Sequence, residues 1–101
     1  MASHQLVAVR FEVFGKVQKV FFRKHTQQEA QHLGLHGWVE NTPQGTVHGE
    51  MQGPLDKVRQ MKAWLETKGS PQSRIDRAVF SEEAPIQAFT FPAFDIRRKQ
   101  H

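Results

Sequence analysis

The chain has 101 residues, enough for one domain with a single hydrophobic core. It contains 14 Lys and Arg against 10 Asp and Glu, a formal net charge of +4, and no Cys. The lack of Cys excludes disulfides, thiolate nucleophiles and Cys-ligated metal, and it fits a reducing compartment. A positive charge suits an anionic partner, but +4 is also ordinary for a small soluble domain and decides nothing alone.

The first segment alternates apolar and other residues from Val7 to Val13, which predicts a half-buried strand. The surrounding run "LVAVRFEVFG" is interrupted by Arg10 and Glu12. It is therefore neither a signal peptide nor a membrane span, which needs about 20 apolar residues. We expect a cytoplasmic protein with no membrane partner.

The period changes after this strand. Apolar or small residues recur at helical spacing at Phe22, Thr26, Ala30 and Leu33, and Gly34 supplies the left-handed residue that commonly ends a helix. The pattern predicts a first helix over 22–33.

A hairpin is predicted next. The run "HGWVENTPQGTVHGEMQG" reads as two strands around a turn. Pro43 and Gly45 stand where a type I turn favours Pro and Gly, at its second and fourth positions.

The rest of the chain predicts a second helix and further strands. Pro54 suits the first position of a helix, and Lys68 and Gly69 end it. Its apolar face consists of Leu55, Val58, Met61, Trp64 and Leu65. After the loop "GSPQS", strand patterns cover 75–80 and 89–96, and Pro85 and Pro92 confine the last segment to a sheet edge.

The predicted order is βαββαβ, with room for a short fifth strand. Each helix has one apolar stripe, which favours an α+β fold: a two-layer sandwich with both helices on one face of an antiparallel sheet. We expect a single domain over 1–101, and we interpret the basic tail "RRKQH" as a solvated end.

This topology predicts where distant residues meet. The first helix returns the chain so that the first two strands run parallel, and a right-handed crossover leaves room for the third strand between them. The loop after the first strand (15–20), the first turn of the helix (Phe22, Arg23) and the end of the second strand (Asn41, Thr42) therefore converge at one edge.

The start of the first helix lacks a capping residue. No Ser, Thr, Asp or Asn stands in "GKVQKVF" to accept bonds from the first helical amides. An anion can take that place, because loop amides, a helix N-terminus and the guanidinium of Arg23 together form a phosphate cradle. The alternative is that water satisfies these amides and Arg23 is a surface charge, and the local sequence does not decide between them.

Three stretches resemble the successive signatures of the acylphosphatase family: "EVFGKVQKVFFRKHT", "LGLHGWVENTPQGTVHGEMQG" and "MKAWLETKGSPQSRID". They follow the family order and cover nearly the whole chain. The resemblance implies a ferredoxin-like fold and hydrolysis of acyl phosphates, the mixed anhydrides of carboxylic and phosphoric acids. It implies no metal and no organic cofactor, with inorganic phosphate as product and inhibitor.

The resemblance also implies roles for particular residues. The arginine after "VFF" binds phosphate in that family, and the asparagine that ends "GWVxN" orients the attacking water; here they are Arg23 and Asn41. The phosphate-binding loop corresponds to Gly15, Lys16, Val17, Gln18, Lys19 and Val20. Without the resemblance, Asn41 before Thr-Pro is more simply a turn residue.

One position departs from the family pattern. The family loop resembles "GxVQGVxFR", and Lys19 stands where its second glycine belongs. We expect this lysine to misaim an amide and slow the enzyme. The alternative is a degenerate member that binds phosphate or a protein with little turnover.

The implied chemistry demands little of side chains. The leaving carboxylate has a conjugate acid of pKa near ~4, so it departs without a general acid. Positioning and charge stabilisation of the phosphoryl oxygens are then the main requirements.

Other functions fit less well. RNA-recognition domains share the βαββαβ order, but their third strand carries aromatic residues and "GTVHGEMQG" has none, so we expect no nucleic-acid partner. Gly34 separates His32 from His36 and ends the helix before they share a face, so we expect no metal site. Trp38 and Trp64 are expected in the core, and the protein is expected to be a monomer.

Overall fold

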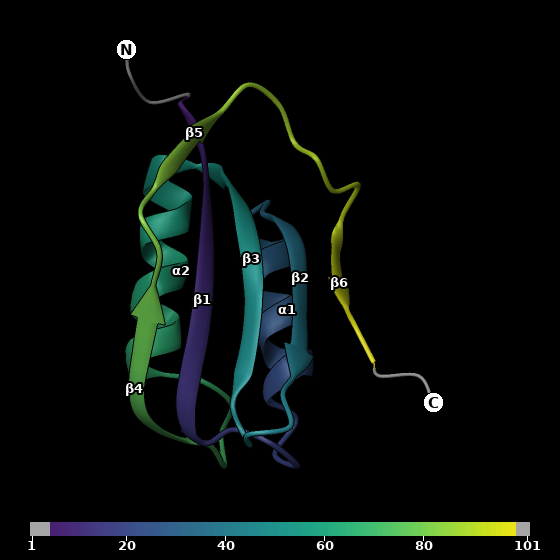
Figure 1. Cartoon of the computed structure of the whole chain (residues 1–101), viewed down its shortest axis with the longest axis vertical. Helices are drawn as coiled ribbons and strands as arrows, with labels where there is room; N and C mark the ends of the chain where they lie inside the picture. The colour runs from purple at the N-terminus through teal and green to yellow at the C-terminus, as the bar shows by residue number, and fades with distance from the viewer. Residues whose placement is uncertain (1–4, 99–101) are drawn as a thin grey trace.

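The computed structural model describes residues 5–98. A sheet lies on one side and two helices cover one of its faces (Figure 1). The elements are β1 (Leu6–Lys16), α1 (Phe22–His32), β2 (His36–Asn41), β3 (Val47–Pro54), α2 (Leu55–Thr67), β4 (Arg74–Phe80), β5 (Ala84–Ile86) and β6 (Phe94–Ile96). The predicted α+β sandwich is confirmed, with two short strands at the end of the chain. Neither helix in this range is long and apolar enough to span a membrane.

The sheet has the order β4-β1-β3-β2-β6, and β5 also pairs with β1. β3 lies between β1 and β2, as the predicted crossover requires. The prediction of an antiparallel sheet is wrong at one edge, because β6 pairs with β2 in parallel. The chain after β5 passes over the end of the sheet before it enters β6, so β6 runs in the same direction as β2 (Figure 1). The predicted strand 89–96 shortens to Phe94–Ile96.

The helix boundaries follow the capping signals closely. α1 ends at His32, and Gly34 follows with a φ of 75°. α2 begins at Leu55, one residue later than predicted, because Pro54 serves as its N-cap. Gly69 follows α2 with a φ of 61°.

The core lies between the helices and the inner face of the sheet. β1 contributes the predicted alternating residues Val7, Val9, Phe11 and Val13, and α2 contributes Val58, Met61 and Leu65. Trp64 is half-buried and packs on the core residue Phe22, with ring centroids 5.8 Å apart.

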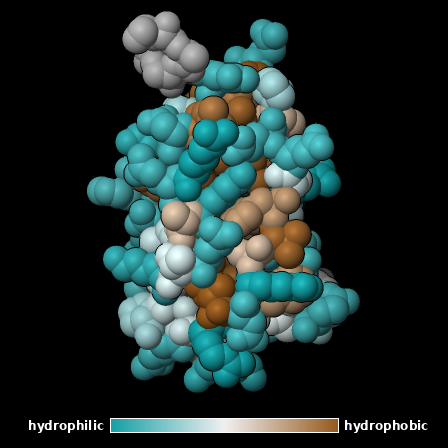
Figure 2. Space-filling view, turned by 90° about the vertical axis from the view of Figure 1, so that its left-hand side faces the viewer, coloured by the Kyte–Doolittle hydropathy of each residue, from teal (hydrophilic) through white to brown (hydrophobic). Residues whose placement is uncertain are grey.

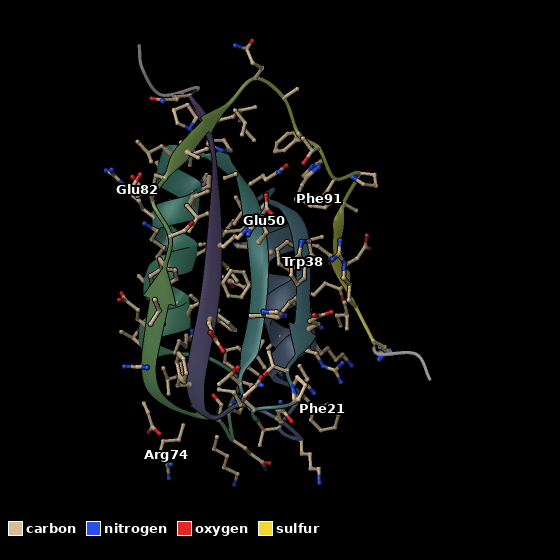
Figure 3. All side chains as sticks on the ribbon, viewed as in Figure 1. Phe21, Trp38, Glu50, Arg74, Glu82 and Phe91 are labelled. Carbon is tan, nitrogen blue, oxygen red and sulfur yellow. The ribbon has the colours of Figure 1, made fainter. Side chains whose placement is uncertain are left out.

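Trp38 does not lie in the core, so that prediction is wrong. It stands between the buried residues Gly37 and Val39, and alternation along β2 turns it to the outer face of the sheet (Figure 3). The guanidinium of Arg97 lies 4.2 Å from its ring centroid.

β4 forms the free edge of the sheet beside α2. Its exposed residues include Arg74, Asp76 and Arg77, and Arg74 Nε donates to Asp76 Oδ1 at 3.1 Å. Figure 2 shows this side of the molecule, where hydrophilic residues separate the hydrophobic patches. Charged side chains on an edge strand discourage pairing with another chain.

Glu83 joins the connection after β4 to α2. Its carboxylate accepts hydrogen bonds from Arg59, at 3.1 and 3.0 Å, and from Lys62 at 2.9 Å. The hydrogen bonds from Arg59, and then the one from Lys62, lower the pKa of Glu83 to about 2.

This lowered pKa predicts a pH-dependent contribution to stability. Because the pKa lies below its unfolded value of about 4.3, the contribution is complete above about pH 4.3 and is lost as the pH falls through about 2. Chemical denaturation from pH 2 to 7 should show that Glu83→Gln destabilises the protein near neutral pH and has little effect near pH 2. Glu82→Gln is the control for the neighbouring charge. A difference independent of pH would contradict the assignment.

Candidate active site

A pocket of about 580 Å³ is lined by residues from the loop after β1, the start of α1 and the ends of β2 and β6. β1, β2 and β6 all run toward the same end of the sheet (Figure 1). Arg23 and Asn41 both line the pocket, so the structure brings these two sequence-predicted residues together. The other lining residues are Val17, Lys19, Phe21, Phe22, Lys24, Gln27, Ile96 and Arg98. The convergence predicted from topology is present.

The loop between β1 and α1 is shorter than predicted. Gly15 and Lys16 belong to β1 and pair with Ile75 and Arg74 of β4. At Gly15, φ is 131°, and a Cβ atom would lie 2.1 Å from the carbonyl oxygen of Arg74. Gly15 is therefore required by the close approach of two strands, and we define the loop that borders the pocket as residues 17–21.

Two features fix this loop. The side chains of Val17 and Val20 are buried, with exposed fractions of 1% and 5%. Gln18 Nε2 donates to the carbonyl oxygens of Thr42 and Thr46, both at 2.9 Å. The side chain of Gln18 thus connects the loop to the turn after Asn41. This connection fixes the position of the loop relative to the end of β2.

The loop contains two non-glycine residues in the left-handed region. The φ angles are 64° at Lys19 and 60° at Phe21. Such a conformation costs about 1–2 kcal/mol per residue. Lys19 itself adopts the conformation that glycine favours, so the structure gives no reason to expect a misaimed loop amide. The left-handed conformation still costs stability, because a lysine adopts it less readily than a glycine does. The strain at Phe21 was not anticipated from the sequence.

The start of α1 has no side-chain cap within the described residues. Phe21 is the N-cap, it makes no capping hydrogen bond, and the first turn contains no acidic residue. The first amides of a helix have no partners inside the helix, and the helix dipole adds partial positive charge there. The feature predicted from "GKVQKVF" is therefore present: an uncapped N-terminus beside a pocket.

Arg23 is half-buried in the first turn of α1. It also lines an adjoining hollow of about 370 Å³ together with Asn41, Thr42, Pro43 and Arg97. Burial lowers the pKa of Arg23, and the positive charge of Arg98 lowers it further. The group stays charged at neutral pH. Within residues 5–98 no carboxylate pairs with Arg23. An anion bound in the pocket would therefore offset the cost of burying the guanidinium and its repulsion by Arg98.

Asn41 has an unused acceptor. Its Oδ1 atom is buried and has no hydrogen-bond partner within the part of the chain that the structure describes. A buried polar atom without a partner is costly, and a water molecule can supply the missing donor. The side chain is therefore suited to hold a water beside Arg23.

Arg97 and Arg98 were interpreted from the sequence as part of a solvated end. Both side chains are exposed, as that interpretation requires, and in addition Arg98 lines the main pocket and Arg97 lines the adjoining hollow. They reach the site because β6 is parallel to β2, so both strands finish at the same edge. The remaining residues of that tail, 99–101, lie outside the described residues.

Metal-ligating side chains do not gather in the described range. Residues 5–98 contain no group of three or more His, Cys, Asp or Glu that could hold a metal ion. His4 and His101 lie outside this range.

The strain at Lys19 predicts the effect of restoring glycine. Lys19→Gly removes a left-handed penalty of about 1–2 kcal/mol, and the freer unfolded chain offsets about 0.4–1 kcal/mol of this gain. We expect the free energy of unfolding to rise by up to about 1 kcal/mol in urea titrations. Lys16→Gly is the matched control, and it should be destabilising because φ at Lys16 is not left-handed. Equal losses in both variants would contradict the strain.

Comparisons of the sequence give a consistent family. A family model described as "Acylphosphatase" matches residues 9–96. "Acylphosphatase-1" of Homo sapiens is 57% identical over 94 residues, covering 93% of this chain and 95% of the relative. "Acylphosphatase-2" of Gallus gallus is 55% identical over 96 residues, covering 95% of this chain and 93% of the relative.

Solved structures agree. An acylphosphatase from Coxiella burnetii superposes with a TM-score of 0.82 at 29% identity, covering 96% of this chain and all (100%) of that one. An acylphosphatase from Bacillus subtilis also gives 0.82, at 28% identity, covering 91% of this chain and 99% of that one.

Proposed function

The chain belongs to the acylphosphatase family and is an enzyme that hydrolyses acyl phosphates, and on this premise we propose that the pocket between loop 17–21, α1 and β2 is its active site. One observation carries the proposal: Arg23 and Asn41 line the same pocket at an uncapped helix N-terminus.

Two kinds of group bind the phosphate: backbone amides and the guanidinium of Arg23. The amides of loop 17–21 and of the first turn of α1 offer hydrogen-bond donors with the favourable end of the helix dipole. Arg23 offers a planar fork that binds two phosphoryl oxygens at once. In the loose transition state of phosphoryl transfer, charge accumulates on these outer oxygens, so the same donors stabilise it.

Asn41 positions the nucleophile. A water that donates to the free Oδ1 attacks phosphorus, a new P–O bond forms, and the bond from phosphorus to the acyl oxygen breaks. The carboxylate leaves with the electron pair, and the protons of the water stay on the phosphate formed. An acyl phosphate dianion and water thus give a carboxylate and dihydrogen phosphate. The leaving carboxylate is a weak base, so the step proceeds without a general acid.

Binding without turnover is the less favoured alternative. It was motivated by Lys19 in place of a family glycine. Lys19 has the left-handed φ that a glycine would adopt, so the lysine does not displace the backbone of the loop. The relatives above are acylphosphatases.

We also propose that the protein acts as a cytoplasmic monomer. The absence of Cys suits a reducing compartment, and the charged residues on β4 disfavour edge-to-edge association. Sedimentation of the purified chain tests the monomer.

The proposed site is tested by hydrolysis of benzoyl phosphate in the presence of a chelator. We expect turnover without added metal and competitive inhibition by inorganic phosphate, because product and substrate share one phosphate site. Hydrolysis that inorganic phosphate inhibits noncompetitively would place the product elsewhere and contradict the proposal.

A further inference from the structure

Phe21 is the most exposed large apolar side chain among the described residues, at 73% accessible. It stands between the buried residues Val20 and Phe22, so the loop turns one aromatic ring outward between two side chains that pack in the core. This outward turn coincides with a left-handed φ of 60°, a strained conformation for a phenylalanine. Strain of this kind concentrates at functional sites.

Exposed cations accompany this ring. Lys19 in the loop, Lys24 in the first turn of α1 and Arg98 after β6 line the same pocket as Phe21. Lys16, the last residue of β1, is exposed as well. Within residues 5–98 none of these four cationic side chains forms an ion pair. We define the basic tip as Lys16, Lys19, Phe21, Lys24 and Arg98.

Little negative charge offsets the basic tip within the described residues. None of the residues that line the pocket is acidic. Asp76, near the start of β4, is paired with Arg74 at 3.1 Å. Figure 3 shows Phe21 and Arg74 at one end of the molecule, and the acidic residues Glu50 and Glu82 away from that end. The basic tip therefore combines an exposed aromatic ring with a local excess of positive charge.

We propose that the basic tip docks on the surface of an anionic membrane, with the ring of Phe21 inserted among the lipid headgroups and the four cations bound to headgroup phosphates and carboxylates. An apolar side chain flanked by basic residues is typical of binding at a membrane interface. The cytoplasmic leaflet is anionic, and each Lys or Arg held near it strengthens binding. An acidic protein would match the charges but would need a pocket for the ring, whereas the headgroup layer accepts an aromatic ring directly.

Docking of this kind goes beyond the proposed activity. The expectation of no membrane partner came from the interrupted run near the N-terminus, which argues against a span and not against surface binding. Lys19, Lys24 and Arg98 line the pocket as well as belonging to the basic tip, so a docked molecule turns the mouth of the pocket toward the membrane.

Co-sedimentation with lipid vesicles tests the docking. The natural protein should bind vesicles that contain about one-third phosphatidylserine and should not bind vesicles of phosphatidylcholine alone. Raising NaCl from about 0.1 M to about 0.5 M should release most of the protein, because salt screens the attraction between exposed charges. Binding is measured without substrate, so its outcome does not depend on the active-site proposal.

Variants of two exposed rings test the apolar contact. Phe21→Ala should lower the partition coefficient about tenfold, equivalent to about 1.4 kcal/mol, because the inserted ring is lost. Phe21→Trp should bind at least as tightly as the natural protein, because Trp favours the membrane interface. Phe89→Ala is the matched control: this ring is exposed but stacks on His36, at the opposite end of β2 from Asn41, and its loss should have no effect.

Variants of single lysines test the charges. Lys19→Gln and Lys24→Gln should each lower the partition coefficient about fivefold, equivalent to about 1 kcal/mol. Lys57→Gln removes the same charge from α2, outside the basic tip, and should leave vesicle binding nearly unchanged.

Three results would overturn the docking. The first is no binding to the phosphatidylserine vesicles at about 0.1 M NaCl. The second is a loss of binding in Phe89→Ala as large as that in Phe21→Ala. The third is a loss in Lys57→Gln as large as that in Lys24→Gln, which would indicate attraction by the net charge of the whole protein.

Discussion

Arg23→Ala is expected to lower kcat/KM for acyl phosphates by at least about 10²- to 10³-fold, the cost of losing one preorganised donor to a developing oxyanion. The loss should exceed that of a simple surface charge, because Arg23 is half-buried beside Arg98 and has no carboxylate partner within residues 5–98. Phosphate inhibition should weaken in parallel, because in the proposed site Arg23 binds both substrate and product.

Two further variants sharpen this result. Arg23→Lys keeps the charge but loses the two-oxygen fork, so it should recover only part of the activity. Arg77→Ala removes an exposed arginine from β4 and should behave as the natural protein. Unfolding of Arg23→Ala in urea should occur near the natural midpoint, since a partly exposed arginine contributes little to stability. Near-normal turnover in Arg23→Ala would contradict its role as the phosphate ligand.

Asn41→Ala is expected to lower kcat by about 10²-fold while the inhibition constant of inorganic phosphate stays nearly the same. In the proposed mechanism, the buried and unpaired Oδ1 of Asn41 holds the attacking water and takes no part in holding phosphate. Steady-state kinetics with phosphate as inhibitor separates the two effects.

Asn41→Asp provides the contrast. It keeps the shape of the side chain but places a negative charge beside the phosphoryl group, so it should weaken phosphate binding as well as turnover. Weaker phosphate binding in Asn41→Ala would mean that Asn41 holds phosphate, and a large loss of stability would favour a role as a turn residue.

Much of the fold could be predicted because local patterns and core packing agree. The alternation in Val7–Val13 and the helical stripe of α2 both face the core. The parallel pairing of β6 could not be predicted, since it depends on the path of the segment after β5 rather than on any local signal. Trp38 was misplaced because a large aromatic residue favours the core on average, while the alternation along β2 turned it outward.

The site shows the same division. The proximity of Arg23 and Asn41 could be predicted from the order of the strands, and the absence of a capping residue before α1 indicated an anion site there. Arg98 could not, because its position depends on the pairing of β6. The strain at Phe21 has no local signature either, since a left-handed phenylalanine is held by the surrounding loop rather than by its own preference.

The most direct test of the proposed site is a phosphate titration of the ¹⁵N-labelled protein, followed by amide chemical shifts. We predict that the amides of loop 17–21 and of the first turn of α1 shift with one common dissociation constant. These shifts should be lost in Arg23→Ala and retained in Asn41→Ala. Shifts confined to another surface, or loop shifts that survive unchanged in Arg23→Ala, would contradict the assignment of the phosphate site.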